Sequence, residues 1–167
     1  MWDDLNIQGK TYKMGHLSPF SMIHKISDTD VTFNVSFGNH VFTDNKETGP
    51  LLYSKQKRYF SQERYERSLE LADLIKQNFI DSYVVPYIDK QNNETYHYME
   101  IYDYSIFFDI RKQGEHVLKL VIISAYEVDD WGRSSIPKGD AVRARYIAHL
   151  RLRGETYFQH HKRKRRQ

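Results

Sequence analysis

Residues 117–123 read Val-Leu-Lys-Leu-Val-Ile-Ile, the most strongly apolar run in the chain. Apolar side chains fill both alternating sets of positions, which is typical of a strand in the middle of a sheet with both faces covered. The run continues directly into Ser124-Ala125-Tyr126. The sequence therefore predicts a sheet whose central strand ends in polar side chains.

Shorter patterns on either side of this run predict further strands. Apolar residues alternate with polar ones at 31–37, as in a strand with one buried face. Residues 83–88 contain Pro86, which favours an edge or bulged strand. Two further strands are predicted at residues 95–101 and 104–111. At 142–152, Arg residues alternate with apolar ones, which we interpret as a strand with a basic face, with a short helix as the alternative.

One helix is predicted at residues 62–78. Ser61 is a favourable N-cap, and Glu63 lies in the first turn, where the helix dipole favours an acid. Apolar residues then recur at helical spacing as far as Phe79. The order of elements predicts an α+β fold, with one antiparallel, strongly twisted sheet of about five or six strands packed on one main helix.

Composition limits the class of protein. A chain of 167 residues with 40% hydrophobic residues fits one globular domain, which we place at residues 1–154, followed by a flexible basic tail at 155–167. The absence of cysteine excludes a disulfide framework, a thiol nucleophile and thiolate metal sites. No apolar run approaches the roughly 20 residues of a membrane span, and the acidic start lacks signal-peptide character. We expect a soluble, cytoplasmic protein without a membrane partner.

Positive charge is concentrated at the C-terminal end. Residues 143–167 hold nine basic residues against one acid, Glu155, so they carry +8 in a chain whose formal charge is +3, which leaves −5 on the rest. Clustered cations attract polyanions and release counterions when they neutralise phosphates. We therefore expect nucleic acid as partner, RNA more than DNA, and an acidic body open to a protein inhibitor or partner. The predicted nucleic-acid-binding residues are Arg143, Arg145, Arg151, Arg153, Lys162, Arg163, Lys164, Arg165 and Arg166.

Four tracts resemble the landmarks of a family of small uncharacterised bacterial proteins carried on accessory or mobile elements. The likeness covers most of the chain up to about Leu152 and implies a context rather than a reaction. The family's usual His-Cys-Phe-Thr tract has Val41 at its second position here, so a thiol at that place is not essential to this chain. The tracts are Gly15-His16-Leu17-Ser18-Pro19-Phe20, the segment from Val35 to Thr43 that contains Gly38-Asn39-His40-Val41, Arg64-Tyr65-Glu66-Arg67-Ser68, and Ser124-Ala125-Tyr126-Glu127-Val128-Asp129.

A weaker likeness links the chain to compact ribonuclease toxins of the barnase, EndoU and RelE type, which cut RNA without metal. Such chemistry needs a base for the 2′-hydroxyl proton, an acid for the leaving oxygen and cations at the phosphate. The resemblance implies His16 or His40 as base or acid, Arg58 and Arg64 at the phosphate, and Ser124 or Tyr126 as orienting groups.

Metal and cofactor sites are not predicted. The carboxylates of Asp103, Asp109, Glu127, Asp129 and Asp130 lack the pattern of a metal-dependent nuclease. His160-His161 has no partner at zinc-ligand spacing, and there is no Gly-rich phosphate loop.

Each candidate residue also has a purely structural interpretation. His40 fits a hydrogen-bonded sheet histidine, His16 fits a turn, and Arg64 fits a solvated helix face. Our leading hypothesis is a nucleic-acid-binding accessory protein that acts as a metal-independent endoribonuclease of toxin type. The alternatives are a non-catalytic nucleic-acid-binding regulator and an adaptor whose acidic body docks a basic protein.

Overall fold

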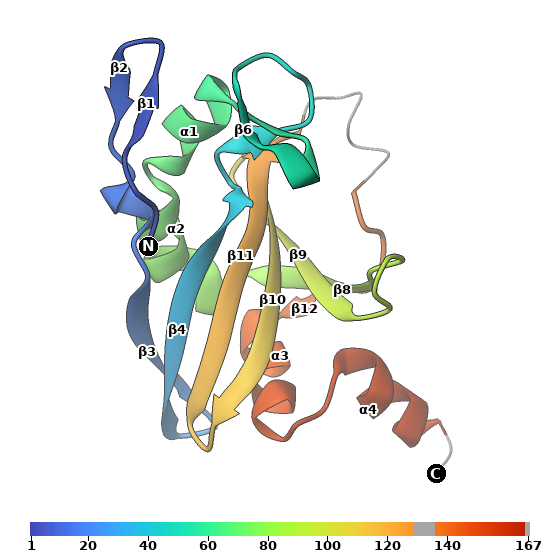
Figure 1. The fold of residues 1–167 in the computed structure, drawn as a ribbon. Coiled ribbons are helices and arrows are strands. Elements are labelled where there is room, and N and C mark those ends of the chain that lie inside the picture. The colour runs from blue at the N-terminus through green and yellow to red at the C-terminus, as the bar shows by residue number, and fades with distance from the viewer. Residues whose placement is uncertain (129–135, 166–167) are drawn as a thin grey trace.

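A seven-stranded sheet organises the protein (Figure 1). The computed structural model describes residues 1–128 and 136–165. The strands of the main sheet, in spatial order, are β12 (Val142–Arg143), β8 (Tyr83–Ile88), β9 (Thr95–Ile101), β10 (Tyr104–Gly114), β11 (Val117–Glu127), β4 (Thr29–His40) and β3 (Phe20–Ile26). The helices are α1 (Gln62–Ser68), α2 (Leu71–Asn78), α3 (Ala144–Leu152) and α4 (Tyr157–Lys164).

Shorter elements flank this sheet. One small sheet pairs β1 (Leu5–Ile7) with β2 (Lys10–Tyr12), and a second is formed by β5 (Thr43–Asp44), β7 (Arg58–Phe60) and β6 (Leu51–Tyr53). The 3-10 turns are η1 (Gly15–Leu17), η2 (Ser54–Gln56) and η3 (Phe79–Asp81).

The main sheet is mixed, so the prediction of an antiparallel sheet of five or six strands on one main helix is wrong in these details. β11 pairs antiparallel with β10 but parallel with β4. A hairpin fixes the relative direction of β10 and β11. Helices α1 and α2 and the six strands β5 to β10 separate β4 from β11 in sequence, so no local turn sets their relative direction. The mixed α/β class stands, whereas the strand count and the number of helices do not.

The apolar face of the sheet forms the core, as the alternating patterns predicted. Helices α2 and α3 cover it, and the ring of Phe79 lies 5.8 Å from that of Phe33 and 5.4 Å from that of Phe108. We call the opposite side of the sheet the outer face. The core-facing residues of the three central strands are Val31, Phe33, Val35, Phe37, Ile106, Phe108, Ile110, Leu118, Leu120 and Ile122.

The predicted helix at 62–78 is two helices. Its N-cap is confirmed, since the Ser61 hydroxyl accepts from the Arg64 amide at 3.4 Å. The break follows Ser68, whose hydroxyl donates to the Tyr65 carbonyl, while the Leu69 amide donates to the Glu66 carbonyl in a 3-10 pattern. The break lets α1 lie over the end of β11 while α2 packs on the core.

The segment at 142–152 forms mainly helix α3, so the strand interpretation is wrong and its helical alternative holds. Ala144, Ile147, Ala148 and Leu150 are buried, and three of them follow the i, i+3, i+4 spacing of one helix face.

Part of the expected tail is also helical. Helix α4 begins with a capping box in which the Thr156 hydroxyl accepts from the Gln159 amide, and Tyr157 is buried.

A bulge in β11 decides which side chains share the outer face. Ile122 pairs with Phe37 and Phe108, and Ser124 pairs with His40 and Phe107. Ile123 is therefore an extra residue relative to β10, whereas β4 has two residues, Gly38 and Asn39, at this point. Residues directly opposite each other point to the same face. The bulge thus moves Ser124 from the core side to the outer face.

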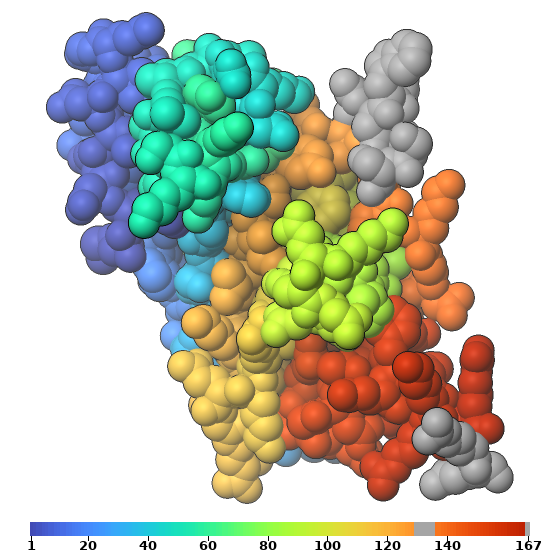
Figure 2. Space-filling model, turned by 45° about the vertical axis from the view of Figure 1, so that its right-hand side comes forward, coloured from blue at the N-terminus to red at the C-terminus, as the bar shows by residue number. Residues whose placement is uncertain are grey.

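Gly38 makes room for this bulge. A Cβ atom at Gly38 would lie 2.9 Å from the carbonyl oxygen of Ile123, closer than side chains normally approach backbone. Figure 2 shows the outer face around β10 and β11 recessed between the blue-green segment before α1 and the yellow-green β8–β9 hairpin.

Candidate functional site

Arg64 connects the polar groups at the bulge. Its Nη1 donates to the carbonyl oxygen of His40 at 2.8 Å, and its guanidinium carbon lies 4.4 Å from the centre of the Tyr126 ring. Arg64 belongs to the first turn of α1, which Ser61 caps. The cap and the helix position therefore place one cation over the ends of β4 and β11.

Arg58 brings a second cation to the same place. It is only 9% exposed, its Nε donates to the Thr43 hydroxyl at 3.0 Å, and its Nη2 donates to the Thr43 carbonyl. The pKa of Arg58 is lowered by burial and further by Arg64, while Asp44 opposes the change. Within residues 1–128 and 136–165, neither arginine forms an ion pair with a carboxylate. The two cations are held by neutral partners, which leaves their charge available to an anion.

His40 lies in the field of both arginines. Partial burial, then Arg58 and Arg64, lower its pKa to about 4. Its imidazole is therefore neutral at pH 7, the form that accepts a proton. Ser124 lies opposite His40 across the parallel strand pair.

Aromatic rings continue from this group across the outer face. The Tyr126 ring stacks on Phe107 with centroids 5.6 Å apart, and Phe107 in turn lies 5.2 Å from Tyr98 and 6.4 Å from Tyr87. We call these four residues the aromatic row. Tyr126 and Phe107 are half-buried. Phe107 was not among the site residues predicted from the sequence.

His16 contacts α1 one turn beyond Arg64. Its Nε2 forms a hydrogen bond of 2.8 Å with the Ser68 hydroxyl, which also donates to the Tyr65 carbonyl. The structure thus gathers five of the six predicted residues around Arg64 and commits the sixth, His16, to holding α1.

Arg67 is a further residue that the sequence did not single out. Its Nε forms an ion pair with Glu127 at 2.9 Å, and its guanidinium carbon lies 5.4 Å from the centre of the buried Tyr104 ring. The observed pair joins α1 to the end of β11 and steadies Arg64 from the next turn.

The predicted basic residues are dispersed rather than arranged along one strand. Arg143 donates to the Asp81 carbonyl, and its guanidinium carbon lies 4.0 Å from the centre of the Tyr83 ring, while Arg145 pairs with Asp81 at 3.2 Å. Several are therefore engaged with the protein itself. Arg153 and Arg163 approach Glu155 at 3.5 and 3.7 Å, Arg151 and Lys162 line a cavity, Lys164 and Arg165 are exposed, and Arg166 lies outside the described residues.

Among the described residues, no cluster of three or more His, Asp or Glu side chains has the arrangement of a metal site. None of the helices in that part of the chain is long and apolar enough to cross a membrane.

Comparison with known proteins gives a family. A family model, described as the YjaZ family, matches residues 4–152, a span that includes every residue gathered around Arg64. No curated protein and no solved structure matches the chain.

Proposed function

From the premise that the chain belongs to the YjaZ family, whose name states no activity, we propose that it binds RNA and cleaves it at His40 without a metal ion. The observation that carries this proposal is the convergence at the bulge of β11 of one neutral imidazole and two arginines that form no ion pair with a carboxylate within residues 1–128 and 136–165. The mobile-element context and the likeness to ribonuclease toxins stay predictions that agree with it.

The two arginines supply the phosphate-binding half of the site. Burial lowers the pKa of Arg64 as it does that of Arg58, which means that part of the hydration of each cation is already lost. A phosphodiester between them would replace that hydration with charge-assisted hydrogen bonds. Arg64 and Arg58 would also stabilise the charge that grows on the phosphorus oxygens during cleavage.

His40 supplies the base. In the proposed step, its imidazole takes the proton of the 2′-hydroxyl, whose oxygen attacks the adjacent phosphorus. The bond from phosphorus to the 5′-oxygen breaks, and that oxygen takes a proton from water. The products are a 2′,3′-cyclic phosphate and a 5′-hydroxyl, and His40 returns its proton to solvent.

The aromatic row gives the site a preference for single strands. The half-buried rings of Tyr126 and Phe107 lie next to Arg64 and offer a stacking surface for an unpaired base. Burial raises the pKa of Tyr126, so its hydroxyl stays protonated at pH 7 and can donate a hydrogen bond. Tyr126 therefore fits the orienting role better than Ser124, which has no ring.

The test is cleavage of end-labelled single-stranded RNA by the pure protein in excess EDTA. We expect fragments that end in 2′,3′-cyclic phosphate, and no cleavage of an otherwise identical substrate with 2′-deoxy sugars. Binding without cleavage would instead support the non-catalytic regulator. If the protein does not bind RNA even at low ionic strength, the result would instead support the hypothesis of an adaptor that docks a basic protein.

The pH dependence of cleavage gives a second test. The acid limb of kcat/KM should have its midpoint near the free-protein pKa of His40, about 4, because the neutral base is required. A bound phosphate offsets the charge of the two arginines, so the pKa of His40 rises in the complex and the acid limb of kcat moves to higher pH. An acid limb of kcat that lies at lower pH than the acid limb of kcat/KM would contradict His40 as the base.

A further inference from the structure

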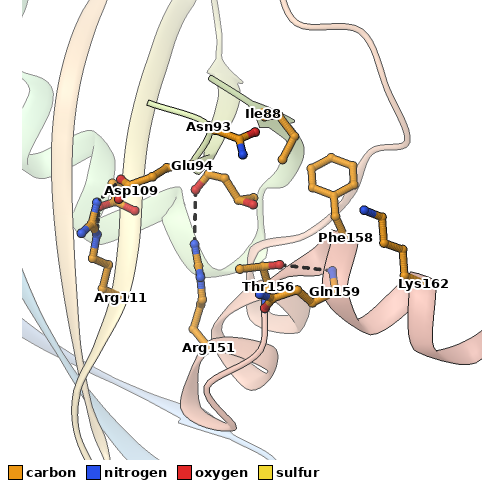
Figure 3. A pocket seen from close by; sticks show the side chains of 11 residues that line it. Ile88, Asn93, Glu94, Asp109, Arg111, Arg151, Thr156, Phe158, Gln159 and Lys162 are labelled. Atoms are coloured by element: carbon orange, nitrogen blue, oxygen red, sulfur yellow. Dashed lines mark hydrogen bonds and ion pairs between the residues drawn. The ribbon is translucent and has the colours of Figure 1, made fainter. Parts of the chain in front are cut away.

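A cavity of about 480 Å³ opens beside β10, away from His40 (Figure 3). β9 pairs with β10 only from Tyr104 to Phe108, so residues 109–114 of β10 have no strand neighbour on that side. Helices α3 and α4 lie along this gap and close it from below. Its volume lies within the range of small-ligand sites in proteins.

Positive charge exceeds negative charge in the wall of this cavity. Arg111 forms ion pairs with both Glu94 and Asp109, so the two carboxylates in the wall are already paired with a cation. The Nη2 of Arg151 donates to the Thr95 carbonyl at 3.2 Å, whereas its buried Nε has no partner among the described residues. Lys162 likewise forms no ion pair within that part of the chain. Two cations thus face the cavity without an anion of their own.

The surroundings of Arg151 make this imbalance costly. Burial lowers its pKa, and Asp109 and Glu94 offset this only in part because Arg111 also acts on it. Behind it lies His97, whose pKa is lowered to about 3 by burial and by Arg151, so that ring is neutral and gives no counter-charge. A partly dehydrated cation in this setting is stabilised by a ligand that brings negative charge.

Helix α4 adds an aromatic wall. Figure 3 shows the ring of Phe158 and the amine of Lys162 reaching into the cavity from one side and Arg151 from below. We propose that this cavity binds a nucleotide, with Arg151 and Lys162 holding its phosphate and Phe158 stacking on its base. The ligand class follows from a phosphate-binding pair beside an aromatic ring, the combination that recognises nucleotides. The site does not depend on RNA cleavage at His40.

Direct titration of the full-length protein with adenosine monophosphate tests the proposal. We expect one bound nucleotide per chain, no binding of adenosine, and weaker binding of inorganic phosphate. Arg151→Gln or Lys162→Ala should weaken the nucleotide about tenfold, since each removes a charge-assisted hydrogen bond. Phe158→Ala should weaken it about fivefold and leave inorganic phosphate unaffected. Lys76→Ala, on α2 far from the cavity, removes one positive charge as a matched control and should change nothing.

The outcomes separate clearly. If the nucleotide does not bind, or binds Lys162→Ala and Phe158→Ala as it binds the parent protein, the proposal is overturned even if Arg151→Gln fails to fold. Equal affinity for inorganic phosphate and no effect of Phe158→Ala would make this an anion site and would also overturn it. A single-stranded RNA oligonucleotide that displaces the bound nucleotide identifies the source as a nucleotide of an RNA chain, whereas no displacement identifies a free nucleotide.

Discussion

His40→Ala is expected to reduce RNA cleavage in EDTA about 10³-fold while RNA binding changes little. The loss follows from removing the base, whose contribution in such reactions is of this order. Binding should persist because the imidazole is neutral at pH 7 and the cations remain. The substitution keeps the hydrogen bond of Arg64, since Arg64 donates to the backbone carbonyl of residue 40 and not to its ring. Cleavage rates under single-turnover conditions measure the effect.

His16→Ala is the matched control. It removes a histidine from the same end of the molecule, together with a hydrogen bond to Ser68. We expect it to lower the free energy of unfolding by about 1 kcal/mol and to leave the cleavage rate within a few-fold of the parent. If the two histidine variants cleave equally well, or if His16→Ala is the inactive one, His40 is not the base.

Gly38→Val is expected to lower the free energy of unfolding by about 2 kcal/mol through overpacking against backbone. The Cβ would meet the Ile123 carbonyl oxygen at 2.9 Å and the Ile123 Cα at 3.5 Å, so the bulge must shift. That shift moves Ser124 and Tyr126 relative to His40. A misplacement of about 1 Å costs catalysis on the order of 100-fold, so cleavage should fall by much more than stability alone explains.

Gly15→Ala serves as the control for this change. A Cβ at Gly15 would have no neighbour within 4 Å. It should therefore keep both parent stability, measured by urea unfolding, and parent cleavage. A Gly38→Val protein that cleaves RNA at the parent rate would show that the bulge does not set the geometry of the site.

Elements with local signals could be predicted from the amino-acid sequence. The run at 117–123 predicted the central strand, but its coverage on both faces is wrong, because only Leu118, Leu120 and Ile122 are buried and the outer-face side chains are exposed or half-buried. Ser61 fixed the start of α1 because an N-cap acts on the amides of its own first turn. The same locality misled at 142–152, where small and apolar residues satisfy both a period of two and a helix face. Only packing of Ile147 and Ala148 in the core selects the helix.

Most residues of the candidate site could be named from the sequence, but their arrangement in space could not. His40, Arg64 and Tyr126 belong to three elements far apart in the chain, and their meeting depends on the parallel register of β4 and β11. The bulge at Ile123 then decides that Ser124 faces outward, and no residue type at that position announces a bulge. The cavity beside β10 arises because β9 begins at Thr95 and pairs with β10 only as far as Phe108, which is a property of neighbouring strands. Side-chain periodicity is written in the sequence, whereas direction, register and the space between elements are set by contacts between distant residues.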